Sequence, residues 1–386
     1  YHPYYIKDRK NRQTVFVIRD NTGTGASQQL DFRANMVDTR MVMKDIPALK
    51  EESYTSTLAN HISRVDFQLS ETRYPLQQRN IMGTWASLSD RLIKGENFGA
   101  DLGKNNGWIN DVSNPVIGEV TVPLEKAKRL YSYVRDNFTC TDYSDIYLNQ
   151  NLKNILKSRN GSVADINLLL VAMLKHEGLN ADPVILSTRR HGYTYPIYPI
   201  IDKFNYVIAR LDVDGKSYYL DASRPGLGFG KLGYECYNGH ARIVNETATP
   251  VDFIADSIIE RKVTSVFVIN DEKGNLAGSI QQTPGYYESN TIRSTVKEKG
   301  KDQIFTDFKK AFTGEVELSE TVIDSLLRYE DPISIRYKFE YKPEKEDIIY
   351  FNPMFGEGFK DNPFKAAERF YPVEMPYAMD ETFLLR

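Results

Sequence analysis

Cysteine is scarce in this sequence, with only Cys140 and Cys236 among 386 residues. Two thiols are too few for a disulfide framework or a zinc–cysteine cluster, although the two could be bridged or free. No apolar run reaches the roughly 18 residues that a membrane helix needs, so we expect no transmembrane segment in this chain. The formal charge of −3 provides no concentrated basic face, which argues against nucleic acid as a partner.

Cofactor motifs are missing as well. The glycine-rich run at residues 226–230 is not followed by a capped helix, as a dinucleotide-binding fingerprint would require. Asp212 and Asp214 lack the later ligands of a calcium loop. We therefore expect neither a cofactor nor a metal ion.

Aromatic residues are abundant, with 25 tyrosines and 19 phenylalanines. Such side chains suit strands and amphipathic surfaces, so we expect much sheet and an exposed binding surface. A length of 386 residues allows two or three domains, each with its own core. The chain starts at Tyr1 rather than at methionine, which is compatible with a processed or trimmed protein.

The most informative stretch is a polar turn that opens directly into an apolar helix. Ser162 is a good N-cap residue, and Asp165 three positions later completes a capping box. Apolar residues then recur at helical spacing until Gly178, and a strand follows at residues 182–188. The dipole at the start of such a helix favours a thiolate, yet the first turn carries Val163 instead of a cysteine.

These residues resemble the core of a transglutaminase-like domain. Catalytic relatives carry Gly-Asp-Cys-x-Asp, then Phe-Asn-His-Val, then Leu-Asp-Ala. This chain keeps Gly161, Asp165, Asn205 and Asp221, as its sequence shows. Val163 stands at the cysteine position and Tyr206 at the histidine position, so the resemblance implies that Asp221 alone survives from the triad, with Tyr206 beside it.

The resemblance implies an α+β fold with a papain-like core between two β-sandwich-like domains, the first of them incomplete. The expected domains are an N-terminal β-rich part at residues 1–115, the core at 116–252 and a C-terminal β-rich domain at 253–386. Segments 42–52 and 362–373 resemble the flanking domains of a bacterial envelope group. By resemblance we expect a protein of a Gram-negative bacterium that faces the periplasm, is associated with the outer membrane or is tethered as a lipoprotein.

With the cysteine and histidine positions replaced, we expect a pseudoenzyme that acts as a binding or scaffold module. Ser162 as nucleophile would need a base, and the phenol of Tyr206 titrates near pH 10. A cysteine-independent peptidase or amidase with an unrecognised site is the alternative, and a subunit of an outer-membrane assembly is a third hypothesis.

The loop at residues 189–199 is rich in aromatic side chains stiffened by proline. Tyr193, Tyr195 and Tyr198, with His191 and the nearby Asn205, are the candidate binding residues. Rigid tyrosines could stack on a glycan or hold an extended peptide, or could simply cover the core. The possible partners are therefore a peptide, a glycan or an envelope protein.

Periodicity also predicts local elements elsewhere in the chain. Helices are expected at residues 84–92, 123–138, 152–156, 302–312 and 320–328. Strands are expected at residues 14–18, 64–69, 207–213, 216–220, 263–269, 276–281 and 335–341. The Asp214-Gly215 pair should join two of these strands in a hairpin.

Overall fold

The computed structural model describes residues 5–20, 28–74, 76–103, 106–270, 275–310, 312, 315–342, 354 and 361–386. The chain divides into two compact units. One comprises residues 1–51 and 58–83, and the other comprises residues 52–57 and 84–386. Among the described residues no helix is both long and apolar enough to cross a membrane.

The first unit contains a long antiparallel ribbon of β1 (Tyr5–Asp20) and β2 (Gln28–Val42). The unit also holds a short helical turn (Leu58–Asn60) and the two-residue strands β3 (Glu71–Thr72) and β4 (Arg79–Asn80). The strand expected at residues 14–18 lies within β1. The strand expected at residues 64–69 is wrong, because that segment joins no sheet and its Phe67 is 84% exposed.

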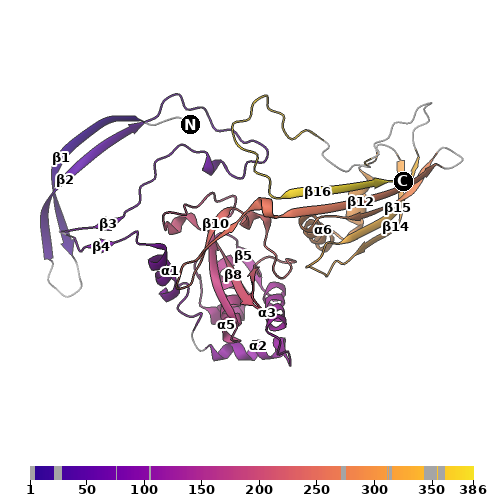
Figure 1. Cartoon of the computed structure of the whole chain (residues 1–386), viewed down its shortest axis with the longest axis horizontal. Helices are drawn as coiled ribbons and strands as arrows, with labels where there is room; N and C mark the ends of the chain where they lie inside the picture. The colour runs from indigo at the N-terminus through magenta and orange to yellow at the C-terminus, as the bar shows by residue number, and fades with distance from the viewer. Residues whose placement is uncertain are drawn as a thin grey trace. The chain divides into compact units, whose positions relative to one another are not determined.

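The central sheet of the second unit is antiparallel, in the order β11-β10-β7-β8-β9. Its strands are β7 (Asn180–Leu186), β8 (Tyr206–Val213), β9 (Lys216–Leu220), β10 (Gly239–Ile243) and β11 (Pro250–Phe253). The helix α5 (Val163–His176) packs against β7 and β8 (Figure 1). Every residue of α5 from Val163 to Leu174 is buried, because the helix is apolar all round and lies between the sheet and other helices.

Four further helices and a small parallel pair of strands complete the core. They are α1 (Trp85–Lys94), α2 (Asn110–Ile117), α3 (Pro123–Asn137), β5 (Thr139–Asp142), α4 (Leu152–Ser158) and β6 (Asn160–Ser162). Leu88, Leu92 and Phe98 belong to the same buried cluster as α3 and α5. Residues 84–98, which the sequence assigned to an N-terminal domain, therefore pack in the core.

The C-terminal part is one five-stranded sheet in the order β14-β15-β13-β12-β16, covered on one face by two helices. Its elements are β12 (Ile259–Asn270), β13 (Leu276–Thr283), α6 (Tyr286–Lys299), α7 (Lys301–Lys309), β14 (Glu315–Asp324), β15 (Ser334–Lys342) and β16 (Ala378–Leu385). Strand β16 returns from the end of the chain and pairs in parallel with β12 (Figure 1).

The expected α+β class and core are confirmed, with two corrections in the C-terminal part. This part is a single sheet with helices rather than a sandwich of two sheets. The helix expected at residues 320–328 is wrong, because residues 315–324 form β14, whose Ile323 is buried against α7 and β15. Pairing with a neighbouring strand overrides local helix propensity there.

The core and the C-terminal sheet meet at the loop after β9. The Tyr131 hydroxyl donates to the carbonyl oxygen of Leu227 at 2.9 Å. The amide of Gly228 donates to the Tyr286 hydroxyl at 2.8 Å, and the guanidinium of Arg135 lies 4.6 Å from the centre of the Tyr329 ring. The loop at residues 226–230 is thus a packed junction.

Candidate functional site

The N-terminus of α5 is capped as the sequence predicts. Ser162 Oγ accepts the amide of Asp165 at 3.2 Å, and Asp165 Oδ2 accepts the amide of Ser162 at 3.0 Å. A Cβ on Gly161 would lie 2.6 Å from that of Asp165, so glycine is required there. Ser162 is buried with its hydroxyl in the cap, and Val163 opens the helix with no exposed surface.

The hairpin of β8 and β9 brings Tyr206 to Asp221, as expected. Asp214 and Gly215, both with positive φ, turn the chain between the two strands. The Tyr206 hydroxyl then donates to Asp221 Oδ2 at 2.8 Å. Val163 and Tyr206 belong to one buried apolar cluster. The residues that the resemblance assigns to the three triad positions therefore lie together at the start of α5.

The Asp221 carboxylate has a complete set of donors. Asn167 Nδ2 donates to its Oδ1 at 2.9 Å, and Ser223 donates to the same oxygen through its amide at 3.0 Å and its hydroxyl at 2.6 Å. Asn167 also accepts the amide of Ala222 at 2.8 Å. These bonds replace the water that a buried carboxylate has lost. Sequence reasoning missed Asn167, although a lone amide in an apolar helix was a signal.

Arg224 covers the Tyr206 hydroxyl on the solvent side. Its Nε donates to that hydroxyl at 3.2 Å, and its terminal nitrogen pairs with Glu235 at 2.7 Å. Its guanidinium also stacks 4.4 Å from the centre of the Tyr143 ring. Burial, and then the charge of Asp221, raises the pKa of Tyr206 well above its usual value. Tyr206 is therefore neutral near pH 7 and cannot act there as a general base.

A pocket of about 800 Å³ opens directly above Arg224. Its walls come from residues 54–56, 142–144 and 188–191, with Asn205, Tyr234, Glu235, Glu374 and Pro376. Arg190 and His191 are exposed there, and neither side chain has a partner among the described residues. The pocket therefore offers polar and charged groups to a ligand, with aromatic faces beside them.

The predicted binding residues divide into two groups. His191 and Asn205 line the pocket, and Tyr193 lies at its edge, where its hydroxyl donates to the carboxylate of Glu374. Tyr195 and Tyr198 do not line the pocket. Both are exposed, and Lys203 Nζ lies 5.6 Å from the centre of the Tyr195 ring. Asn205 is tied internally, with Oδ1 accepting the amide of Thr188 at 2.9 Å.

The two cysteines are free thiols close to this site. Cys140 lies in β5, and burial raises its pKa to about 11. Burial also raises the pKa of Cys236, which packs in the same cluster as Tyr206. Both thiols are therefore protonated near neutral pH and are poor nucleophiles. Among the described residues no group of histidine, cysteine and acidic side chains could hold a metal ion.

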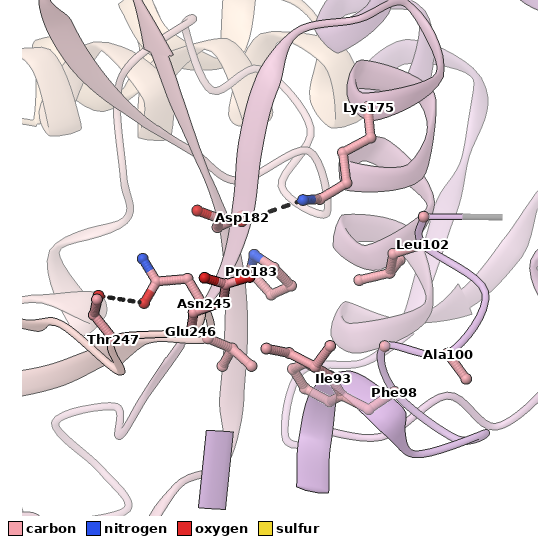
Figure 2. Close-up of a pocket in the computed structure, with 13 residues that line it drawn as sticks. Ile93, Phe98, Ala100, Leu102, Lys175, Asp182, Pro183, Asn245, Glu246 and Thr247 are labelled. Carbon is pink, nitrogen blue, oxygen red and sulfur yellow. Dashed lines mark hydrogen bonds and ion pairs between the residues drawn. The ribbon is translucent and has the colours of Figure 1, made fainter. Parts of the chain in front are cut away.

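A second cavity of about 590 Å³ lies near the opposite end of α5. Figure 2 shows Lys175 reaching from the helix to Asp182 on the neighbouring strand, with Ile93 and Phe98 on the apolar side. The Lys175–Asp182 ion pair measures 3.2 Å. The described residues that line this cavity include no cysteine, histidine or tyrosine. Its charged side chains are Glu246 and the paired Lys175 and Asp182.

The solved structures that resemble the chain include one titled a "putative protease" from Parabacteroides distasonis, with 11% identity and a TM-score of 0.39. Another is titled a "putative cysteine protease" from Cytophaga hutchinsonii, with 13% identity and a TM-score of 0.24. The alignments cover 88% and 57% of this chain but only 65% and 66% of those chains, less than two thirds of each.

No curated protein matches the chain at a significant level. The sequence pattern of the transglutaminase-like superfamily matches residues 110–214, a range that includes Val163 and Tyr206 and ends before Asp221. The capped helix α5 and the β8–β9 hairpin, which carry the site, begin within that range. This chain therefore contains a domain of the transglutaminase-like superfamily.

Proposed function

We propose that this chain is a non-catalytic, transglutaminase-like binding module that holds an extended peptide in the pocket above Arg224. The observation that carries the proposal is the hydrogen-bonded series Arg224–Tyr206–Asp221 at the start of α5. A triad needs a nucleophile, a base and a group that orients the base. Here Val163 offers no nucleophile and Tyr206 is a neutral phenol.

Other residues near the site do not supply the missing chemistry. Asp221 is fully buried and accepts hydrogen bonds from Tyr206, Asn167 and Ser223, so its carboxylate is engaged within the protein. Cys140 is the nearest partly exposed thiol, and its raised pKa keeps it protonated. These features support binding over peptidase or amidase activity.

The pocket itself supports ligand binding over a purely structural role. It remains open at about 800 Å³, a volume in the range of small-ligand sites. The exposed Arg190 at its wall can form a bidentate pair with a carboxylate of the ligand. A structural subunit whose cleft is filled would not keep these groups accessible.

A screen of peptide and amide substrates with the purified chain tests the enzymatic alternative. We expect no turnover above the uncatalysed rate, and turnover that persists after repurification would contradict the proposal. Binding is tested in parallel with a short-peptide library and an oligosaccharide array. Arg190→Gln should weaken peptide binding at unchanged stability, whereas Lys153→Gln, an exposed charge on α4, should not. Binding to oligosaccharides alone would favour the glycan hypothesis.

We also propose, on the resemblance of segments 42–52 and 362–373 alone, that the protein faces the periplasm or the outer membrane. Fractionation of the native bacterium with an antibody against this chain tests the proposal. Recovery in the cytoplasmic fraction would contradict it. The binding proposal does not depend on this result.

A further inference from the structure

The chain's own segment 371–376 contributes two residues to the wall of the pocket above Arg224. Both Glu374 and Pro376 line the pocket. The amide of Glu374 donates to the carbonyl oxygen of Tyr54 at 2.7 Å, and Glu374 Oε2 accepts the amide of Ser56 at 2.6 Å. Residues 371–376 are therefore seated on the short segment 52–57 as an extended peptide would be.

Two side chains of the loop after β7 bind this segment. Arg189 donates to the carbonyl oxygen of Glu374 at 2.6 Å, and the Tyr193 hydroxyl donates to Glu374 Oε1. A backbone carbonyl and an adjacent carboxylate are the groups that an extended acidic peptide presents. Arg189 thus binds the main chain of one glutamate, and Tyr193 binds the side chain of the same residue.

The ionisation of these groups agrees with a carboxylate–phenol contact. Burial opposes the charge of Glu374, but hydrogen bonds from Ser56 and Tyr193 outweigh it and lower the pKa of Glu374. Burial, followed by the hydrogen bond and charge of Glu374, raises the pKa of Tyr193 to about 12. Glu374 is thus charged and Tyr193 is a neutral donor near pH 7.

The segment is anchored independently on both sides of Glu374. Upstream, the carboxylate of Glu52 accepts the amides of Phe370 at 2.8 Å and Tyr371 at 3.3 Å. Downstream, the Tyr377 ring stacks on Tyr287 with centroids 5.4 Å apart. The segment is therefore held on both sides by contacts that do not involve Glu374.

We propose that the surface formed by Arg189 and Tyr193 recognises an extended peptide bearing a glutamate, and that residues 371–376 occupy this surface in the ligand-free chain. The ligand class rests on the function proposed above, because the surface borders the same pocket. A tethered segment has an effective concentration of the order of millimolar, so an external peptide must compete with it. Weakening the tethered contact should therefore strengthen external binding.

The first test measures hydrogen exchange without any ligand, so it does not depend on the proposed function. In Glu374→Gln we expect the amide at position 374, which donates to the carbonyl oxygen of Tyr54 in the wild type, to exchange at least tenfold faster than in the wild type. Glu246→Gln is the matched control, because Glu246 is exposed and has no partner among the described residues. Unchanged exchange in Glu374→Gln would overturn the assignment of residues 371–376 as the occupant.

The second test uses a fluorescent peptide with the sequence of residues 371–377. It should bind Glu374→Gln at least tenfold more tightly than the wild type, and a peptide with glutamine at the position of Glu374 should bind at least tenfold more weakly. Equal affinity for the two peptides would overturn the acidic class. Competition by acidic oligosaccharides but not by the peptide would assign the surface to a glycan and overturn the peptide proposal.

A second variant guards against loss of folding in Glu374→Gln. Tyr193→Phe removes only the hydroxyl that binds the carboxylate, and should also speed exchange of the amide at position 374. Tyr195→Phe is its control, because Tyr195 lies in the same loop with its ring exposed and does not contact Glu374. Equal exchange in the two variants would overturn the role of Tyr193. Failure of these tests leaves the substrate screen and the Arg190→Gln result unaffected.

Discussion

Breaking the hydrogen bond between Tyr206 and Asp221 is the most direct test of the proposal that this site is not catalytic. If the pair has become part of the buried core, its loss should appear as lost stability. Asp221→Asn replaces the acceptor Oδ2 with an amide nitrogen, which can only donate to the Tyr206 hydroxyl oxygen. That oxygen already accepts a hydrogen bond from Arg224 Nε at 3.2 Å. The hydroxyl must then turn to Ser223 Oγ, 3.3 Å away. One charge-assisted bond is lost, so we expect a destabilisation of about 2–3 kcal/mol.

Tyr206→Phe removes the same bond from the other side. It leaves Asp221 Oδ2 without the Tyr206 hydroxyl as donor and Arg224 Nε without that hydroxyl as acceptor, at a cost of about 2–3 kcal/mol. Because both variants delete one interaction, the double variant should cost about 1–2 kcal/mol less than the sum. Asp256→Asn, at an exposed position, is the control and should change stability by less than about 0.5 kcal/mol.

Equilibrium unfolding in urea, followed by tryptophan fluorescence, measures these differences. The chain has two tryptophans, Trp85 and Trp108, and both pack against the central core. The signal therefore reports the unit that contains the site rather than the β1–β2 ribbon. Additive costs, or a change below about 0.5 kcal/mol in Asp221→Asn, would refute the structural role of the pair. So would loss of peptide binding by Asp221→Asn at unchanged stability.

Three further predictions follow from neighbouring contacts. If the resemblance holds, the thiol in Val163→Cys should react faster with iodoacetamide near pH 7 when Tyr206→His is added, and equal rates would mean that the two positions do not face each other. Burial, and then the charge of Arg242, lowers the pKa of His240 to about 4. The unfolded chain therefore binds this proton first, and about 2–3 kcal/mol of stability should be lost as the pH falls from about 6.5 to about 4; urea unfolding of His240→Gln should lack this loss. In Gly228→Ala the new Cβ would lie 2.6 Å from a backbone oxygen between β14 and β15, so the variant should lose about 1–3 kcal/mol of stability. Gly103→Ala is the control and should keep its stability, because no atom lies within 4 Å of the new Cβ.

Local sequence was sufficient to predict the structure where residues close together in the chain form the contacts. The cap at Ser162 and Asp165 and the turn at Asp214-Gly215 are made by residues within three positions of each other. The central helix was equally clear, because its apolar residues recur at helical spacing. The replacement of a cysteine by Val163 and of a histidine by Tyr206 could be read only through resemblance to a family, and the pseudoenzyme interpretation stays a prediction.

Sequence reasoning was insufficient where partners come from distant parts of the chain. Residues 320–328 have helical character locally, but hydrogen bonding to β15 makes residues 315–324 a strand. The donors around Asp221 could not be listed in advance, since Asn167 lies 54 positions away in another element. The contact of Tyr193 with Glu374 spans 181 positions. Local patterns thus determined the elements and the order of the core, whereas tertiary packing decided which side chains complete the site, because burial forces polar groups to find partners wherever the fold brings them.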